Sequence, residues 1–176
     1  MNMARTSRAR SLTALGGAVL AALAVACGEG VVAPLSIPQE EWRQEPADVS
    51  LRLLAYDHHA GLGEARMVLR SPGEWADVWT QWQANRWPKS DPPEVDFQEE
   101  MVLLAVLGTR GSGGYAIAID SMTETADEVV VHVRTAAPGE NCVVTQALTR
   151  PGVAVAAPAR SKPVRFVDRA FVVDCG

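Results

Sequence analysis

The chain has 176 residues, of which 48% are hydrophobic and 21% are charged. This apolar content excludes disorder as the main state of the chain. The 16 Lys and Arg against 21 Asp and Glu give a formal net charge of −5. A nucleic-acid-binding function is therefore not expected, because the phosphate backbone demands a basic surface.

Residues 1–26 have the pattern of an export signal. Three arginines and no acidic residue precede an uncharged, apolar run at residues 11–26. Because this run is shorter than the roughly 20 apolar residues of a membrane-spanning helix, it predicts a cleaved signal peptide rather than a permanent anchor.

The sequence around Cys27 resembles the lipobox of bacterial lipoproteins, in which the cysteine carries the lipid and becomes the mature N-terminus. Residues 23–28 read Leu-Ala-Val-Ala-Cys-Gly, with the usual leucine displaced by one position. We therefore expect cleavage before Cys27, lipidation of Cys27, and a location in the cell envelope, on the outer membrane or the periplasmic face. The alternative is a plain signal peptide followed by an incidental cysteine.

Cleavage before Cys27 would leave 150 residues, and the net charge would fall from −5 to −8 because three arginines and no acids depart. A chain of this length forms one domain with a self-sufficient core. Residues 27–48 are rich in Gly, Glu, Val, Pro and Gln without periodicity, which predicts a flexible tether. The single globular domain is expected at residues 49–176.

Cys142 and Cys175 remain as an even pair once Cys27 is assigned to lipid. Disulfides form and persist in exported chains, so these two cysteines are expected to pair. A metal site is the competing interpretation, but no histidine lies near them at ligand spacing. No metal or other cofactor is expected.

Alternation of apolar and polar residues predicts strands through most of the domain. The first two, at residues 49–53 and 65–69, flank a predicted hairpin turn at residues 58–63. The continuously apolar run at residues 101–107 predicts a central strand buried on both faces. Further strands are expected at residues 115–119, 129–133, 143–148, 153–157 and 164–173.

One helix is predicted between these strands. Ser71-Pro72-Gly73-Glu74 has the residues of a capping box, with Pro at the first helical position. Beyond it, an apolar stripe at helical spacing consists of Trp75, Val78, Trp79 and Trp82. We interpret the stripe as a cover for the sheet; the alternative is an aromatic platform for a ligand such as a sugar.

The expected fold class is therefore mainly β, with α+β as the alternative. It is a sandwich-like or two-sheet domain of seven or eight strands, antiparallel throughout, with one Trp-rich covering helix.

The sequence contains no convincing catalytic constellation, and no catalytic residue is assigned. His58 and His59 follow Asp57 in a predicted turn, where solvated side chains are the ordinary outcome. The glycine-rich segment 108–114 lacks the Lys-Ser/Thr ending of a phosphate-binding loop and leads into a strand, so we expect a hairpin loop. An envelope ligand-binding protein or hydrolase that uses the Trp helix or the two histidines remains the alternative function.

Residues 94–168 resemble the PrcB family, named as a subunit of a surface protease complex. The resemblance rests on Val95-Asp96-Phe97, Met101-Val102-Leu103, Leu107-Gly108, Gly113-Gly114-Tyr115-Ala116-Ile117, the strand at residues 129–133, Pro138, Gln146 and Thr149-Arg150-Pro151. It implies an exported, non-enzymatic protein that binds, matures or steadies a protease.

Two loops are candidate contacts for such a protein partner. The first consists of Gly111, Ser112, Gly113, Gly114 and Tyr115, where glycine allows close backbone approach and tyrosine suits a binding hot spot. The second consists of Thr149, Arg150 and Pro151, expected at the same end of the domain. In the alternative interpretation the glycines only form a tight turn, and Tyr115 begins a stripe that faces the core.

Overall fold

The computed structural model describes residues 49–175, which form two β-sheets and one helix. The predicted signal peptide, Cys27 and the tether lie outside the described residues. The strands are β1 (Arg52–Asp57), β2 (Ala65–Leu69), β3 (Glu100–Val106), β4 (Ala116–Glu124), β5 (Val129–Pro138), β6 (Gly152–Pro158) and β7 (Val164–Val173), and the helix is α1 (Pro72–Trp82).

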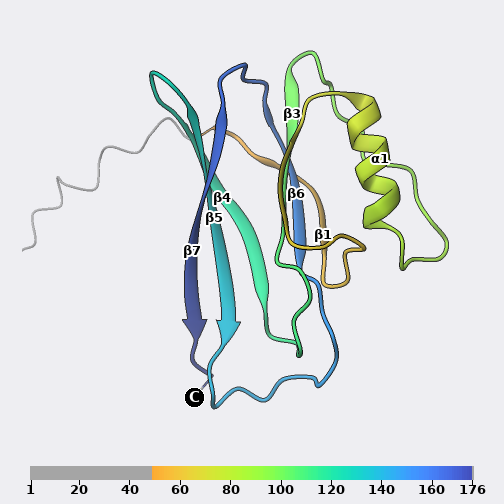
Figure 1. Ribbon diagram of the computed structural model, residues 1–176, viewed down its shortest axis with the longest axis vertical. Coiled ribbons are helices and arrows are strands. Elements are labelled where there is room, and N and C mark those ends of the chain that lie inside the picture. The colour runs from red at the N-terminus through yellow and green to blue at the C-terminus, as the bar shows by residue number, and fades with distance from the viewer. Residues whose placement is uncertain (1–48, 176) are drawn as a thin grey trace, which may run out of the picture. The chain divides into compact units, whose positions relative to one another are not determined.

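The described residues are arranged in three layers. The first sheet has the strand order β1-β6-β3-β2 and the second the order β4-β5-β7. Figure 1 shows the second sheet on one side of the first and α1 on the other. The predicted fold class, a mainly β sandwich-like domain with one covering helix, is confirmed.

β3 and β6 lie at the centre of the first sheet and are buried on both faces. Met101 and Leu103 face the second sheet, whereas Val102 and Leu104 belong to the cluster that packs under α1. Successive side chains of a strand point to opposite faces, so an unbroken apolar run fills both interfaces. The prediction of a doubly buried strand at residues 101–107 is thus confirmed, with β3 shifted by one residue.

α1 begins at the predicted cap. The Glu74 amide donates to Ser71 Oγ at 3.3 Å, and the Arg70 amide donates to the Glu74 carboxylate at 2.8 Å. That backbone hydrogen bond from Arg70, together with the Ser71 hydroxyl, lowers the pKa of the Glu74 carboxyl. Among residues 49–175, no helix has the length and apolarity needed to span a membrane.

The tryptophans of α1 are core residues. Trp75, Trp79 and Trp82 are at most 8% exposed. The indole N–H of Trp75 donates to the Pro93 carbonyl at 3.0 Å, and that of Trp79 to the Ser90 carbonyl at 2.8 Å. Both indole N–H groups therefore have hydrogen-bond acceptors within the chain. The stripe therefore covers the first sheet. The alternative prediction, an exposed aromatic platform for a ligand on this helix, is wrong.

β1 and β2 do not form the predicted hairpin. β1 pairs with β6, and β2 pairs with β3, at opposite edges of the first sheet. The two central strands are the most apolar and take partners on both sides, which separates their flanking strands. The connection passes close to the end of α1, where the Gly61 amide donates to the Trp82 carbonyl at 2.9 Å.

Two further predictions about connections are wrong. Residues 108–114 do not close a hairpin, because β3 and β4 belong to different sheets. Residues 143–148 form no strand, and Val143 and Leu148 are exposed to solvent. An alternating pattern alone does not supply the hydrogen-bonding partner that makes a strand.

The pairing is not antiparallel throughout, because β7 runs parallel to β5 over its full length. β6 intervenes between them and lies in the other sheet. The chain therefore returns to the second sheet in the direction of β5, and a crossover of this kind is what a parallel pair requires.

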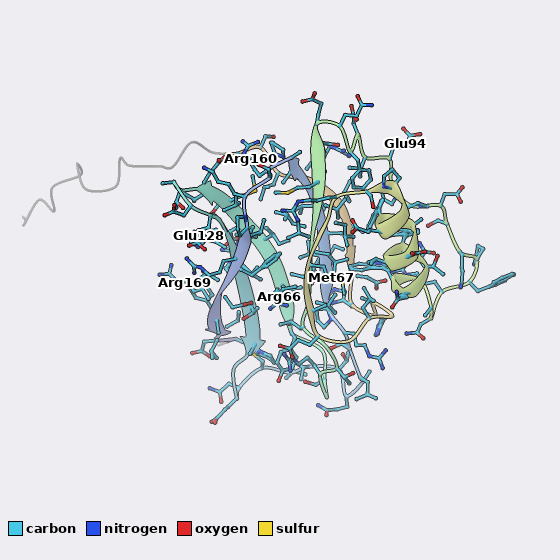
Figure 2. All side chains as sticks on the ribbon, turned by 45° about the horizontal axis from the view of Figure 1, so that its top comes forward. Arg66, Met67, Glu94, Glu128, Arg160 and Arg169 are labelled. Carbon is cyan, nitrogen blue, oxygen red and sulfur yellow. A yellow bond between two sulfur atoms is a disulfide. The ribbon has the colours of Figure 1, made fainter. Side chains whose placement is uncertain are left out.

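The two sheets are joined across one open side by an ion pair. Arg66 of β2 donates through Nε to Asp168 of β7 at 3.2 Å and through Nη1 to the Val106 carbonyl at 2.8 Å. In Figure 2 Arg66 lies at the opening between the sheets.

Two acidic residues, at the end of β4 and just before β5, form ion pairs with basic residues just before β7 and at its start. Glu124 pairs with Lys162 at 2.7 Å, and Glu128 pairs with Arg165 at 2.6 Å. The hydrogen bond from Lys162 lowers the pKa of Glu124, and the one from Arg165 lowers that of Glu128. A carboxyl group whose pKa is lower in the folded than in the unfolded state stabilises the fold at pH values above its unfolded pKa. That stability is lost as the pH falls through the folded pKa.

Replacing both residues, as Glu124→Gln with Glu128→Gln, should lower the melting temperature near neutral pH and flatten its decline between about pH 5 and pH 3. Thermal unfolding followed by circular dichroism across this range measures the effect. Glu94→Gln with Glu140→Gln is the control, since neither carboxylate forms an ion pair within residues 49–175. Equal pH profiles for wild type and the first variant would contradict the expectation.

The predicted disulfide between Cys142 and Cys175 is present, across a sequence separation of 33 residues. It joins the segment after β5 to the residues after β7. The Gly139 amide reinforces this connection by donating to the Val173 carbonyl at 2.8 Å.

Replacing both cysteines with alanine should lower the free energy of unfolding by about 3 to 4 kcal/mol, because the unfolded chain regains the entropy of the closed loop. Urea denaturation of the oxidised wild type and the double variant measures the difference. Reduced wild type should match the variant; unchanged stability in both would refute a stabilising cross-link.

Candidate functional site

The connections at one end of the sandwich gather the residues that the sequence singled out. Segments 58–64, 107–115 and 139–151 follow β1, β3 and β5, and β7 ends beside them. We call these three segments the loop end. It lies at the bottom of Figure 1, together with the C-terminus.

The two predicted contact loops are hydrogen-bonded to each other. The Arg110 amide donates to the Thr149 carbonyl at 2.8 Å, and the Thr149 amide donates back to Arg110 at 3.0 Å. The Thr149 hydroxyl donates to the Ser112 carbonyl at 2.8 Å. The structure thus brings Gly111–Tyr115 and Thr149–Pro151 to one end of the domain.

Two of the glycines are used for contacts within the chain. A Cβ on Gly113 would clash with Thr145 Oγ1, and one on Gly114 would lie 2.8 Å from Val144 Cγ1. Gly114 also has φ +84°, a conformation that favours glycine. The close backbone approach that these residues permit is therefore to segment 139–151. Gly111 differs, because a Cβ there would meet nothing within 4 Å.

Tyr115 and Pro151 face inward. Tyr115 packs against the core between the sheets, and the Arg110 guanidinium lies 5.8 Å from its ring centroid. Pro151 is fully buried, and its carbonyl accepts from the Leu107 amide at 2.9 Å. The surface available from the predicted set is therefore formed by Gly111 and Gly114, which are exposed, and by Ser112, Tyr115 and Arg150, which are partly exposed. A role of any of the eight residues in partner binding stays a prediction.

A small pocket of about 180 Å³ opens beside Arg150, between the loop end and the turn after α1. It is lined by His59, Asn85, Leu148, Thr149 and Arg150. The Arg150 Nε donates to Thr109 Oγ1 at 2.9 Å, which fixes the guanidinium without neutralising it. This pocket can accept a small polar or anionic group.

The side chains of Asp57, His58 and His59 give no support for metal or acid–base chemistry. Asp57 is 4% exposed and accepts hydrogen bonds from the His59 amide at 2.8 Å and from Arg86 Nε at 2.8 Å. Its carboxylate therefore holds the turn together. His58 stacks edge-on against Tyr56, with ring centroids 5.1 Å apart. Within residues 49–175 no three His, Cys, Asp or Glu residues form a cluster that could hold a metal ion.

A larger groove, which the sequence analysis missed, lies at the same end, on the outer face of the second sheet and beside Tyr56 of β1 in the first sheet. Its volume is about 420 Å³, and it is lined by Tyr56, Ala116, Ile117, Ala118, Arg134, Ala136, Phe171 and Val173. The sequence signal that could have predicted this groove is the presence of apolar residues at both inward and outward positions of β4, β5 and β7 near this end. Burial raises the pKa of the Tyr56 hydroxyl.

Exposed apolar side chains concentrate around the loop end. Those on the segments and strand ends described above are Tyr56, Val143, Leu148, Phe171, Val172 and Val173. Of the remaining large exposed apolar residues in the described part of the chain, Leu53 lies toward the other end of β1 and Trp87 follows α1. Clustered exposed apolar surface is typical of protein interaction sites.

Comparison with known families gives one match. The model of the family described as PrcB C-terminal matches residues 101–158, about a third of the chain, from β3 to β6. All eight residues of the two predicted contact loops lie inside this range. The search of curated proteins found no match. The search of solved structures also found none. The resemblance noted in the sequence is thus confirmed: residues 101–158 match the PrcB C-terminal family.

Proposed function

We propose that this chain is an exported, lipid-anchored, non-enzymatic protein that is accessory to a cell-surface or periplasmic protease. The match to the PrcB C-terminal family suggests association with a protease complex. The observation that carries the proposal further is the concentration of exposed apolar side chains at the loop end.

The loop end has the properties of a surface for a protein partner. Leu148 is 70% exposed and Val143 is fully exposed, on a segment held by the disulfide and by the hydrogen bonds to segment 107–115. Immobilised apolar side chains bind at a low entropic cost, because little freedom remains to be lost. The segment therefore presents a preorganised apolar contact.

No observation favours the alternative of an envelope ligand-binding protein or hydrolase. The three tryptophans of α1 are buried against the first sheet, so this helix offers no aromatic surface to a ligand. His58 and His59 are exposed, but Asp57 is already held by Arg86. A binding role without chemistry fits these side chains better than a catalytic role.

Substituting Leu148→Glu should reduce recovery of the partner protease at least tenfold, because a carboxylate would be buried at the centre of an apolar contact. The measurement is crosslinking of the full exported chain in its native envelope, followed by affinity capture and identification of proteases. Leu53→Glu is the matched control, since Leu53 is 63% exposed and lies away from the loop end.

Recovery of a protease with wild type and Leu53→Glu, but not with Leu148→Glu, is the expected result, provided all three melt at similar temperatures. Recovery of no protease with the wild type would overturn the accessory function. Equal recovery with both variants would overturn the loop end as the contact surface.

The lipid anchor has its own test, because Cys27 lies outside the described residues. Cys27→Ala should abolish incorporation of labelled fatty acid and move the protein from the membrane fraction to the soluble one. The Cys142→Ala, Cys175→Ala variant is the control and should keep the label. A membrane-bound, labelled Cys27→Ala protein would refute the assignment.

A further inference from the structure

The outer face of the second sheet changes character along its length. A sheet with one face on the core normally presents polar residues on the other. β4 and β5 follow this rule away from the loop end, where Ser121, Thr123 and His132 line an adjoining hollow that Arg169 also borders. Toward the loop end the positions on this face are instead apolar.

These apolar positions form the groove of about 420 Å³ described above. Ala116 pairs with Ala136, which pairs with Phe171, so a row of two alanines and one aromatic ring crosses the three strands. The alanines form a low floor between Tyr56 on one side and Phe171 on the other. The volume and the mostly apolar, aromatic lining are those of ligand-binding sites.

The groove crosses all three strands of the second sheet. Its lining extends from Ala116 and Ala118 of β4, through Ala136 of β5, to Phe171 and Val173 of β7. Because neighbouring strands lie about 4.8 Å apart, this span of about 10 Å accommodates the side chains of two or three residues of an extended segment.

The polar margin of the groove is cationic. Arg134 lies in the lining and pairs with Asp120 at 3.0 Å. Arg169, the neighbour of Arg134 across the strands, lines the adjoining hollow rather than the groove itself. Its guanidinium lies 6.0 Å from the Phe171 ring centroid, and no acidic side chain within residues 49–175 pairs with it. In Figure 2 Arg169 projects from the second sheet, away from the first. Two guanidinium groups and one carboxylate leave one net positive charge, on a chain whose own net charge is −5.

We propose that this groove binds an extended segment of a protein partner in which apolar side chains flank an acidic residue. The apolar side chains fill the hollow between Tyr56 and Phe171, and the segment crosses the open face of the sheet from β4 toward β7. The carboxylate lies against Arg169, where planar guanidinium and carboxylate groups match. The proposal rests on the proposed function only in that the partner is then the protease or its complex.

The test is a titration of the isotope-labelled exported chain with two capped pentapeptides, Leu-Phe-Glu-Leu-Val and Leu-Phe-Gln-Leu-Val, followed by NMR. The amides of Ala116, Ala118 and Ala136 should shift with the Glu peptide. The Gln peptide should bind at least fivefold more weakly, because it lacks the charge that faces Arg169.

Two pairs of variants separate the groove from the rest of the sheet. Ala118→Leu fills the hollow and should weaken binding at least tenfold, whereas Thr123→Leu, on the same strand and the same face outside the groove, should not. Arg169→Gln should remove the preference for the Glu peptide, whereas Arg165→Gln should keep it. Phe171→Ala removes one side of the groove and should also weaken peptide binding, so it provides a second test if Ala118→Leu does not fold.

Several results would overturn the proposal. These are the absence of shifts with either peptide, shifts confined to other surfaces, or equal binding by Ala118→Leu and Thr123→Leu. Self-association of the wild type that Ala118→Leu abolishes would identify a second copy as the occupant. Displacement of the peptide by phosphatidylglycerol vesicles, with the same dependence on Ala118, would identify a lipid.

The titration needs no protease, so its failure is distinguishable from failure of the proposed function. A protease captured in a Leu148-dependent manner, with no peptide binding, would leave the accessory function and refute the groove. Peptide binding without any captured protease would leave the groove and refute the accessory function.

Discussion

The burial of β3 and β6 on both faces is the constraint on which the rest of this structure depends. Every side chain from Met101 to Val106 is fully buried, and β6 is nearly as apolar. A strand of this kind needs an apolar layer on each side, and neither layer alone suffices. The second sheet covers one face and the tryptophans of α1 cover the other, so both layers follow from this one pair of strands.

The same constraint determines where the connections lie. Because β3 and β6 occupy the centre, β1 and β2 are displaced to the edges, and β4, β5 and β7 form a separate sheet. Each passage between the sheets at the ends of β3 and β5 then crosses the same end of the domain. The loop end is thus built from segments distant in sequence, joined by the Arg110–Thr149 hydrogen bonds and by the disulfide.

The second sheet carries the surface available for binding because only one of its faces is covered. Its strands supply apolar residues to the core, and at the loop end they also supply alanines and Phe171 to the open face. Small side chains beside an aromatic ring create a hollow, whereas uniformly large ones would fill it. This explains why the groove accompanies the exposed residues of segment 139–151 at one end and not along the whole sheet.

The sequence by itself determined the fold class, the doubly buried strand, the capped helix and its buried stripe, the disulfide pair and the family resemblance. These depend on local periodicity, capping chemistry and cysteine number, which act over a few residues or in one compartment. Only the tertiary structure decided the strand order, the parallel pairing of β5 with β7, the loop status of residues 143–148 and the groove. The physical reason is that strand partners are chosen by competition among all strands for the central positions, and no residue encodes its partner locally.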